Sequence, residues 1–247
     1  MEALVKSGIE DICIIRGSEE EREEYHKFFE TPLPQDHFAK LNPEAQEYEN
    51  RILEIGKHLH YVYQKEKRGF GHAVYQAVEF ANNEPVMLLL GDTIYHSHTN
   101  KPCALQLIEQ YEKYNMLTLS IHDVPLADVS HYGILTGTWE DKDEKVMSVS
   151  RMVEKPKASY AEEFLYTRHK DGSKHYKSVF GQYILTPEVF EQLHDDIINS
   201  KDDEKEIELT AALDKVRERN GMIAVQLDGE MYDMGNYNAY KNCIKNY

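Results

Sequence analysis

The chain has 247 residues, with 28 Lys plus Arg against 44 Asp plus Glu, so its formal net charge is −16. This charge repels long polyanions unless a basic patch is segregated, and the sequence has no such patch, so we expect no nucleic-acid partner. The longest aliphatic run, residues 86–90, is far shorter than the roughly 20 residues of a spanning helix, and no signal peptide is visible. We therefore expect a cytoplasmic protein without a membrane partner.

Short apolar strands and amphipathic helices are predicted to alternate along the chain. A short helix ends near Gly8, and Ser18 with Glu21 forms a capping-box pattern that predicts a helix to about Phe29. Residues 31–58 contain three prolines and are predicted to be an irregular excursion or an inserted helical arm. The predicted strands are residues 11–16, 85–91, 116–124, 146–154, 178–185 and 222–227. The predicted helices are residues 71–81, 103–115, 187–198 and 206–219, the last of them stopped by Gly221.

The repeated strand–helix–strand order predicts an α/β fold. Several strands are continuously apolar, as strands buried on both faces of a parallel sheet are. We therefore expect one domain over residues 1–247, a Rossmann-like α/β/α layered sandwich around a mostly parallel mixed sheet. In such folds the ligand lies beyond the carboxyl ends of the strands.

Two candidate ligand-binding segments precede and follow the helix predicted over residues 71–81. Gly69 and Gly71 lie at its start, and glycines there let the backbone approach a planar ligand or phosphate, although a plain turn has the same pattern. Asp92 follows the most apolar strand. A carboxylate at that end of a buried strand can hold Mg²⁺ in the ligand crevice, or it can simply cap a turn.

Two further segments lie in the second half of the chain. Glu154 and Lys155 precede Pro156 at a strand end; the Glu can accept hydrogen bonds from sugar hydroxyls and the Lys can meet a phosphate, or the two form an exposed ion pair. Asp233 precedes the last helix, either as its cap or as a second carboxylate for the same metal. The pairs His58/His60 and His96/His98 could ligate zinc from one strand face, but neither has an obvious third ligand.

Seven motifs occur in an order that resembles the bacterial-type UTP–glucose-1-phosphate uridylyltransferases, within the sugar-phosphate nucleotidyltransferase family. The resemblance runs from residue 1 to the end and is weakest over residues 18–58. The motifs are GHAV at 71–74, LLLGD ending at Asp92, YGIL at 132–135, VEKPK at 153–157, GQYIL at 181–185, EIELT at 206–210 and DMGN at 233–236. The resemblance implies a fold like that of the GT-A nucleotidyltransferases.

The resemblance also implies roles for the candidate residues. Gln64 matches the glutamine that reads the uracil edge, and Gly69 and Gly71 match the loop that packs on the nucleoside. Asp92 and Asp233 match the two aspartates that hold Mg²⁺ beside the phosphates. Gly133 matches the glycine beside the glucose, while Glu154 and Lys155 match the pair that binds sugar hydroxyls and phosphate. His72 belongs to the motif without an assigned chemical role.

The implied reaction is UTP plus glucose 1-phosphate giving UDP-glucose plus pyrophosphate. Two features differ from the family pattern. LGD replaces the LPD that is common in uridylyltransferases, which leaves a related thymidylyl- or cytidylyltransferase open. The family's opening strand and GxGTR loop are absent from the sequence, so the chain resembles an N-terminally truncated member. Because this loop holds the triphosphate in the family, the alternative is a nucleotide-sugar-binding protein or an inactive fragment without turnover.

Absence of the opening strand would also expose an edge of the sheet. We therefore expect a homo-oligomer that covers this edge.

Overall fold

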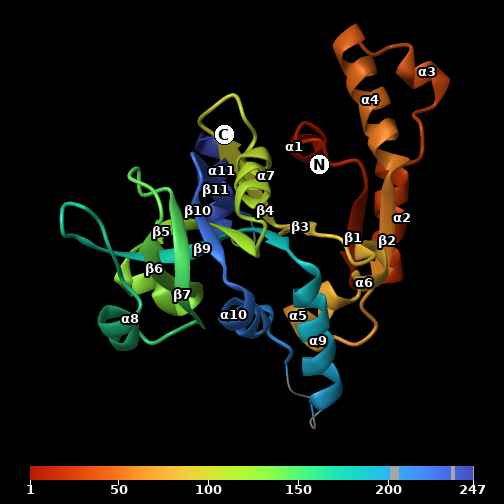
Figure 1. Ribbon diagram of the computed structural model, residues 1–247. Coiled ribbons are helices and arrows are strands. Elements are labelled where there is room, and N and C mark those ends of the chain that lie inside the picture. The colour runs from red at the N-terminus through yellow and green to blue at the C-terminus, as the bar shows by residue number, and fades with distance from the viewer. Residues whose placement is uncertain (201–205, 235–236, 247) are drawn as a thin grey trace.

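The computed structural model describes residues 1–200, 206–234 and 237–246 (Figure 1). The helices are α1 (Glu2–Val5), α2 (Glu19–Phe29), α3 (Gln35–Phe38), α4 (Pro43–Gly56), α5 (Phe70–Tyr75), α6 (Val78–Ala81), α7 (Cys103–Tyr114), the 3₁₀ helix η1 (Leu126–His131), α8 (Ala158–Phe164), α9 (Pro187–Asn199), α10 (Leu209–Asn220) and α11 (Tyr237–Asn246).

The strands form one large sheet and two small ones. They are β1 (Ile12–Arg16), β2 (Leu59–Tyr63), β3 (Val86–Leu89), β4 (Thr93–Ser97), β5 (Thr118–Val124), β6 (Gly133–Trp139), β7 (Val146–Glu154), β8 (Thr167–Arg168), β9 (Lys174–Leu185), β10 (Ile223–Gln226) and β11 (Gly229–Asp233). The large sheet has the order β3-β9-β5-β10-β7-β6, with β8 paired to β9, while β1 pairs with β2 and β11 with β4.

Both faces of the large sheet are covered by apolar packing. On one face, residues of β5, β7 and β9 pack with α9 and α10 around fully buried side chains such as Leu119 and Leu213. On the other face, α7 contributes Leu107 to a second cluster that includes Phe180 and Val225. In Figure 1, α7 and α10 accordingly lie on different sides of the strands. This layering confirms the predicted α/β fold with a mixed sheet.

The direction of pairing differs from the prediction of a mostly parallel sheet. In the large sheet, β10 is parallel to β5, but β9 is antiparallel to β3, β5 and β6, and β7 is antiparallel to β6 and β10. Continuous apolar runs indicate burial on two faces, and helices on both faces of an antiparallel sheet produce the same pattern. Continuous apolar runs therefore do not distinguish parallel from antiparallel strands.

The predicted elements occur with shifted boundaries. The helix predicted over residues 71–81 is broken into α5 and α6, and the one predicted over 206–219 begins at Leu209. Half of the capping box forms: Ser18 Oγ accepts a hydrogen bond from the Glu21 backbone N–H, while the Glu21 carboxylate accepts from the backbone N–H of Gly17 and not of Ser18. Residues 31–58 contain the helices α3 and α4, and α4 packs on α2 in an extension of the molecule (Figure 1).

Among the described residues, no helix combines the length and the apolar character that crossing a lipid bilayer requires.

Candidate active site

The loop after β2 holds Gln64 by two hydrogen bonds. Its amide Nε2 donates to the carbonyl oxygen of Gly69 at 3.1 Å and to Nδ1 of His72 at 3.1 Å. Both amide protons are thereby used, and Oε1 has no hydrogen-bond partner among the described residues. The side chain is therefore oriented with an acceptor available to a ligand.

His72 is the group that fixes this orientation. An amide nitrogen only donates, so Nδ1 of His72 must accept, which requires that nitrogen to be unprotonated. Burial lowers the pKa of His72, and the nearby charge of Arg68 lowers it further. Sequence reasoning placed His72 in a motif without a role; the structure shows that it positions Gln64.

Gly69 and Gly71 allow close contact with the segment that precedes α10. Gly69 has a φ of +97°, in the region that favours glycine, at the start of α5. The Gly71 N–H donates to the carbonyl oxygen of Ile207 at 2.8 Å, and a Cβ at residue 71 would lie only 2.8 Å from that same oxygen. One side of the glycine pair thus packs against the backbone of Ile207.

Gly133 and Glu154 face each other across β6 and β7. They are direct partners in the strand register, and a Cβ at residue 133 would lie 3.1 Å from Oε2 of Glu154. The same oxygen accepts a hydrogen bond of 2.7 Å from Oγ1 of Thr210 on α10. The Glu154 carboxylate is therefore held in place, and Gly133 opposite it has no side chain. Thr210 lies in the EIELT motif, and its role was not predicted.

Lys155 follows Glu154 in a left-handed backbone conformation, with a φ of +44°. Its N–H donates to the carbonyl oxygen of Tyr132 at 3.0 Å, which ties the turn to the start of β6. Its Nζ lies 3.6 Å from Oε1 of Glu154 and its side chain is 63% exposed. A non-glycine residue in this conformation is held there by its surroundings at some energetic cost. The turn presents the ammonium group to solvent beside the carboxylate.

Residues 206–210 connect the two groups of candidate residues. Ile207 exchanges backbone hydrogen bonds with the glycine loop: its N–H donates to the Arg68 carbonyl at 2.7 Å and its carbonyl accepts from Gly71. Three residues later, Thr210 bonds Glu154. In Figure 1, α10 correspondingly lies between the part with β6 and β7 and the part with α5 and α9. The structure thus brings Gln64, Gly69 and Gly71 into a connected arrangement with Gly133, Glu154 and Lys155.

The backbones at Asp92 and Asp233 are adjacent. Asp233 ends β11 and is the register partner of Thr93, the residue that follows Asp92. The Met234 N–H donates to the carbonyl oxygen of Asp92 at 2.6 Å. The Asp92 side chain is exposed. The side chain of Asp233, together with Gly235 and Asn236 of the DMGN motif, lies outside the described part of the structure.

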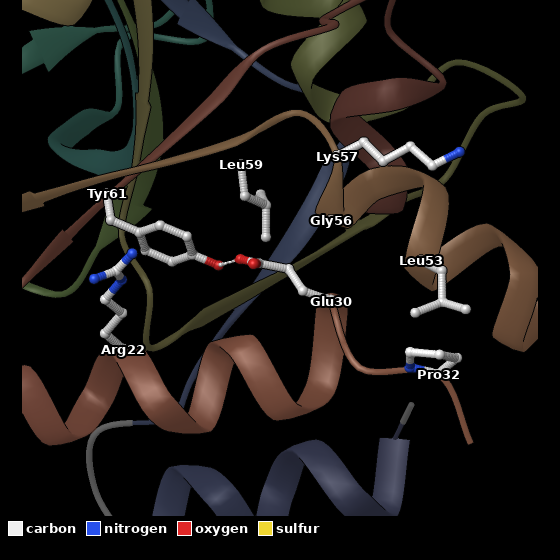
Figure 2. A pocket seen from close by; sticks show the side chains of 8 residues that line it. All are labelled: Arg22, Glu30, Pro32, Leu53, Gly56, Lys57, Leu59 and Tyr61. Atoms are coloured by element: carbon white, nitrogen blue, oxygen red, sulfur yellow. Dashed lines mark hydrogen bonds between the residues drawn. The ribbon is translucent and has the colours of Figure 1, made fainter. Parts of the chain in front are cut away.

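A cavity of about 560 Å³ lies away from these residues, between α2, α4 and β2 (Figure 2). Tyr61 points into it and donates a 2.9 Å hydrogen bond to Oε1 of Glu30. Burial, together with this bond to a carboxylate, raises the pKa of Tyr61 to about 12. The cavity wall also contains Arg22, Leu53 and Lys57 but none of the predicted site residues.

Of the two histidine pairs considered as zinc ligands, His58, His60 and His98 lie close to carboxylates. His58 and His60 both approach Oδ1 of Asp11, at 3.7 and 3.4 Å, and Nε2 of His98 lies 3.4 Å from Oε1 of Glu230. Potential metal ligands converge elsewhere in the described part of the chain. Asp123, His169 and His175 each have one ligand-type atom, all within 4.8 Å of one another.

A glycine loop, an oriented amide and a Glu–Lys pair are thus connected through residues 206–210, and comparison with known proteins identifies the family. The chain belongs to the nucleotidyl transferase family, whose profile matches residues 1–247. It is similar to the UTP–glucose-1-phosphate uridylyltransferase of Staphylococcus epidermidis, with 32% identity over 239 residues, covering 95% of this chain and 75% of that protein. The Bacillus subtilis protein of the same name is 31% identical over 235 residues, covering 95% and 74%.

Solved structures give the same result. An apo UDP-glucose pyrophosphorylase superposes with a TM-score of 0.80 at 29% identity, covering 99% of this chain and 83% of that one. A UDP-glucose pyrophosphorylase in complex with UDP-glucose has a TM-score of 0.78 at 28% identity, covering 100% and 85%. The resemblance inferred from the motifs is therefore confirmed.

Proposed function

We propose that the chain, as one nucleotidyltransferase domain over residues 1–247, forms UDP-glucose and pyrophosphate from UTP and glucose 1-phosphate. The observation that carries this proposal is the segment 206–210, which holds the Gln64 loop and Glu154 in one arrangement. Two of the relatives are named for this reaction, and one solved structure holds UDP-glucose. The partners are thus small molecules, and we propose a cytoplasmic homo-oligomer that takes no nucleic acid and does not bind membranes.

The Gln64 geometry favours uracil over cytosine. Oε1 of Gln64 is an acceptor, and uracil presents a ring N–H there, whereas neutral cytosine presents a second acceptor. Two facing acceptors leave buried groups unpaired, which a polar site rejects strongly. Thymine has the same edge as uracil, so the sugar and the remainder of the pocket separate UTP from dTTP.

Gly133, Glu154 and Lys155, the sugar half of the site, are proposed to bind glucose 1-phosphate. Glu154, fixed by Thr210, accepts hydrogen bonds from sugar hydroxyls, and the absence of a side chain at Gly133 leaves room beside it. Lys155 offers an exposed cation to the phosphate. A phosphate oxygen of glucose 1-phosphate would then attack the α-phosphorus of UTP in line, and pyrophosphate would leave on the opposite side. Positioning and charge neutralisation are sufficient, and no covalent enzyme intermediate is required.

Asp92 and Asp233 are proposed to hold Mg²⁺. Carboxylate oxygens are the ligands this cation prefers, and the exposed Asp92 carboxylate is next to the backbone of Asp233. When bound, Mg²⁺ neutralises charge that develops on the phosphate oxygens.

The test is pyrophosphate release by the purified chain with UTP, glucose 1-phosphate and Mg²⁺. We expect turnover with UTP that exceeds turnover with CTP by at least about 10²-fold, the discrimination expected of a polar group left unpaired. Turnover with dTTP, which differs from UTP in the ribose 2′-hydroxyl and the methyl group of the base, measures the contribution of these two groups. Calorimetry with UDP-glucose runs beside the assay. Binding of UDP-glucose without pyrophosphate release would contradict the proposed reaction and support a binding protein instead.

A further inference from the structure

A hairpin outside the candidate active site places two histidines next to an aspartate. β8 and β9 form the hairpin, with Thr167 opposite His175, so His169, two residues beyond Thr167, lies on the same face as His175. On its other side β9 pairs with β5, where Asp123 is opposite Lys177, two residues beyond His175. The strand registers of β5, β8 and β9 therefore gather Asp123, His169 and His175 on one face.

The distances between potential ligand atoms suit a shared metal ion. Nδ1 of His175 lies 3.1 Å from Oδ1 of Asp123, and all three ligand atoms lie within 4.8 Å of one another. Tetrahedral ligands about 2.0–2.2 Å from zinc are themselves separated by about 3.3 Å. Two of the ligands already have this separation, and the third is within a small side-chain movement of it.

His169 is oriented as a metal ligand. Its Nδ1 is 2.7 Å from Oε2 of Glu144, while its Nε2 is buried and has no hydrogen-bond partner among the described residues. Glu144 is fixed in turn, because Oε1 accepts from the Lys170 N–H at 2.8 Å. A carboxylate that holds one ring nitrogen of a histidine leaves the other with its lone pair directed outward, as metal-binding histidines have it. A buried ring nitrogen without a partner is otherwise unfavourable.

We propose that Asp123, His169 and His175 bind one divalent transition-metal ion. Two imidazoles and one carboxylate select ions such as Zn²⁺ over Mg²⁺ or Ca²⁺, which prefer all-oxygen sites. Asp123 and His175 are 47% and 34% exposed, so water can supply the remaining ligand. The ion would tie the hairpin to β5.

The site is expected to bind moderately rather than tightly. Nζ of Lys177, whose side chain is 1% exposed, lies 2.9 Å from Oδ1 of Asp123 and competes electrostatically with a cation. The buried ammonium has a second partner in Oε1 of Gln226 at 3.2 Å, so it keeps a hydrogen bond when Asp123 turns towards the ion. We therefore expect a micromolar, exchangeable site.

The test is Zn²⁺ binding to metal-stripped protein without a histidine tag, measured by calorimetry and by elemental analysis at equilibrium with dialysis buffer of known, saturating Zn²⁺ concentration. One ion per chain is expected at micromolar affinity, with at least a tenfold loss in both His169→Ala and His175→Ala. His60→Ala is the matched control, because His60 also faces a carboxylate, Asp11 at 3.4 Å, but does not belong to the convergent group. It should bind as the parent does. Unchanged stoichiometry and affinity in both cluster variants would overturn the proposal.

A measurement on the unmutated chain guards against variants that fail to fold. Co²⁺ should give the visible absorption bands of four- or five-coordinate cobalt, displaced by Zn²⁺, and Zn²⁺ should raise the melting temperature reversibly with a chelator. Ligation by the thiolates of Cys13 and Cys103 should not contribute, because burial raises the pKa of each to about 11. A spectrum of hexaaqua Co²⁺ with no change in melting temperature would also overturn the proposal.

Discussion

Lys155, which we propose binds the sugar phosphate, is positioned by its backbone. Its left-handed conformation is maintained by the hydrogen bond to Tyr132, and its ammonium group is exposed beside Glu154. Lys155→Ala should weaken UDP-glucose binding by about 1.5–3 kcal/mol, the scale of a charge-assisted hydrogen bond. UMP binding should change much less, since UMP carries no sugar phosphate. Calorimetry with both ligands measures the difference.

Lys157→Ala is the control for this prediction. Lys157 is exposed, lies two residues away and caps α8 through its backbone carbonyl alone, so removal of its side chain should leave both affinities nearly unchanged. Equal losses for UMP and UDP-glucose in Lys155→Ala would show that Lys155 does not contact the sugar phosphate.

Under the proposed function, we expect His72 to make nucleotide binding sensitive to pH. Its pKa is lower in the folded chain than the ordinary value of 6.5, so its contribution is fully present above about pH 6.5 and is lost as the pH falls through the lowered folded value. Protonation removes the acceptor that holds Gln64, and UMP binding should weaken by about 1 kcal/mol. Titrations of UMP at stepwise lower pH measure this loss.

His72→Asn supplies the matched comparison. Asn can accept from Gln64 through its side-chain oxygen but does not titrate, so its UMP affinity should remain flat where the parent's falls. The same pH slope in both proteins would assign the effect to another group.

At the scale of elements, the contact between α5 and the segment before α10 requires a glycine. Gly71→Ala would place a Cβ 2.8 Å from the Ile207 carbonyl oxygen and 2.9 Å from Cδ2 of Leu193. The backbone must shift, and we expect the free energy of unfolding to fall by about 1–3 kcal/mol in urea titrations. Gly91→Ala, where a Cβ would meet nothing within 4 Å, should change it by less than about 0.5 kcal/mol. Similar values for the two variants would contradict this packing account.

Elements with strong local signals were predictable from the sequence, and those set by distant contacts were not. β7 has its predicted bounds, residues 146–154, and Gly221 ends α10 with a φ of +82° as expected. The strand β11 was not predicted, because its residues pair with β4, more than a hundred positions earlier in the chain. Antiparallel pairing of β9 was likewise a property of topology and not of local pattern.

The candidate site follows the same division. Glu154 and Asp92 could be proposed because a carboxylate at a strand end is visible in the sequence. The role of Thr210 could not, since its place in the EIELT motif does not reveal its contact with Glu154 in the fold. Asp123, His169 and His175 were also missed, because their convergence depends on the registers of β5, β8 and β9.

At the scale of the whole molecule, the small β1–β2 sheet is less buried than the large one. Leu119 and Ile121 in β5 are fully buried, whereas β1 is half-buried over all but Arg16, and α2 has no buried residue. Elements with little buried apolar surface open at lower free energy. Native-state hydrogen exchange should therefore show β1 amides opening at least about 2 kcal/mol below those of β5. Uniform protection of the two strands would indicate a single cooperative unit.

The segment 206–210 predicts that binding of one ligand affects the affinity for the other. Because one short stretch contacts both the proposed nucleoside loop, through Ile207, and Glu154, through Thr210, we expect occupation of either half to restrain the other. A thermodynamic cycle then demands reciprocity: UMP should tighten glucose 1-phosphate by the same factor by which glucose 1-phosphate tightens UMP. The finished nucleotide sugar, which fills both halves at once, would consequently be released more slowly than either fragment.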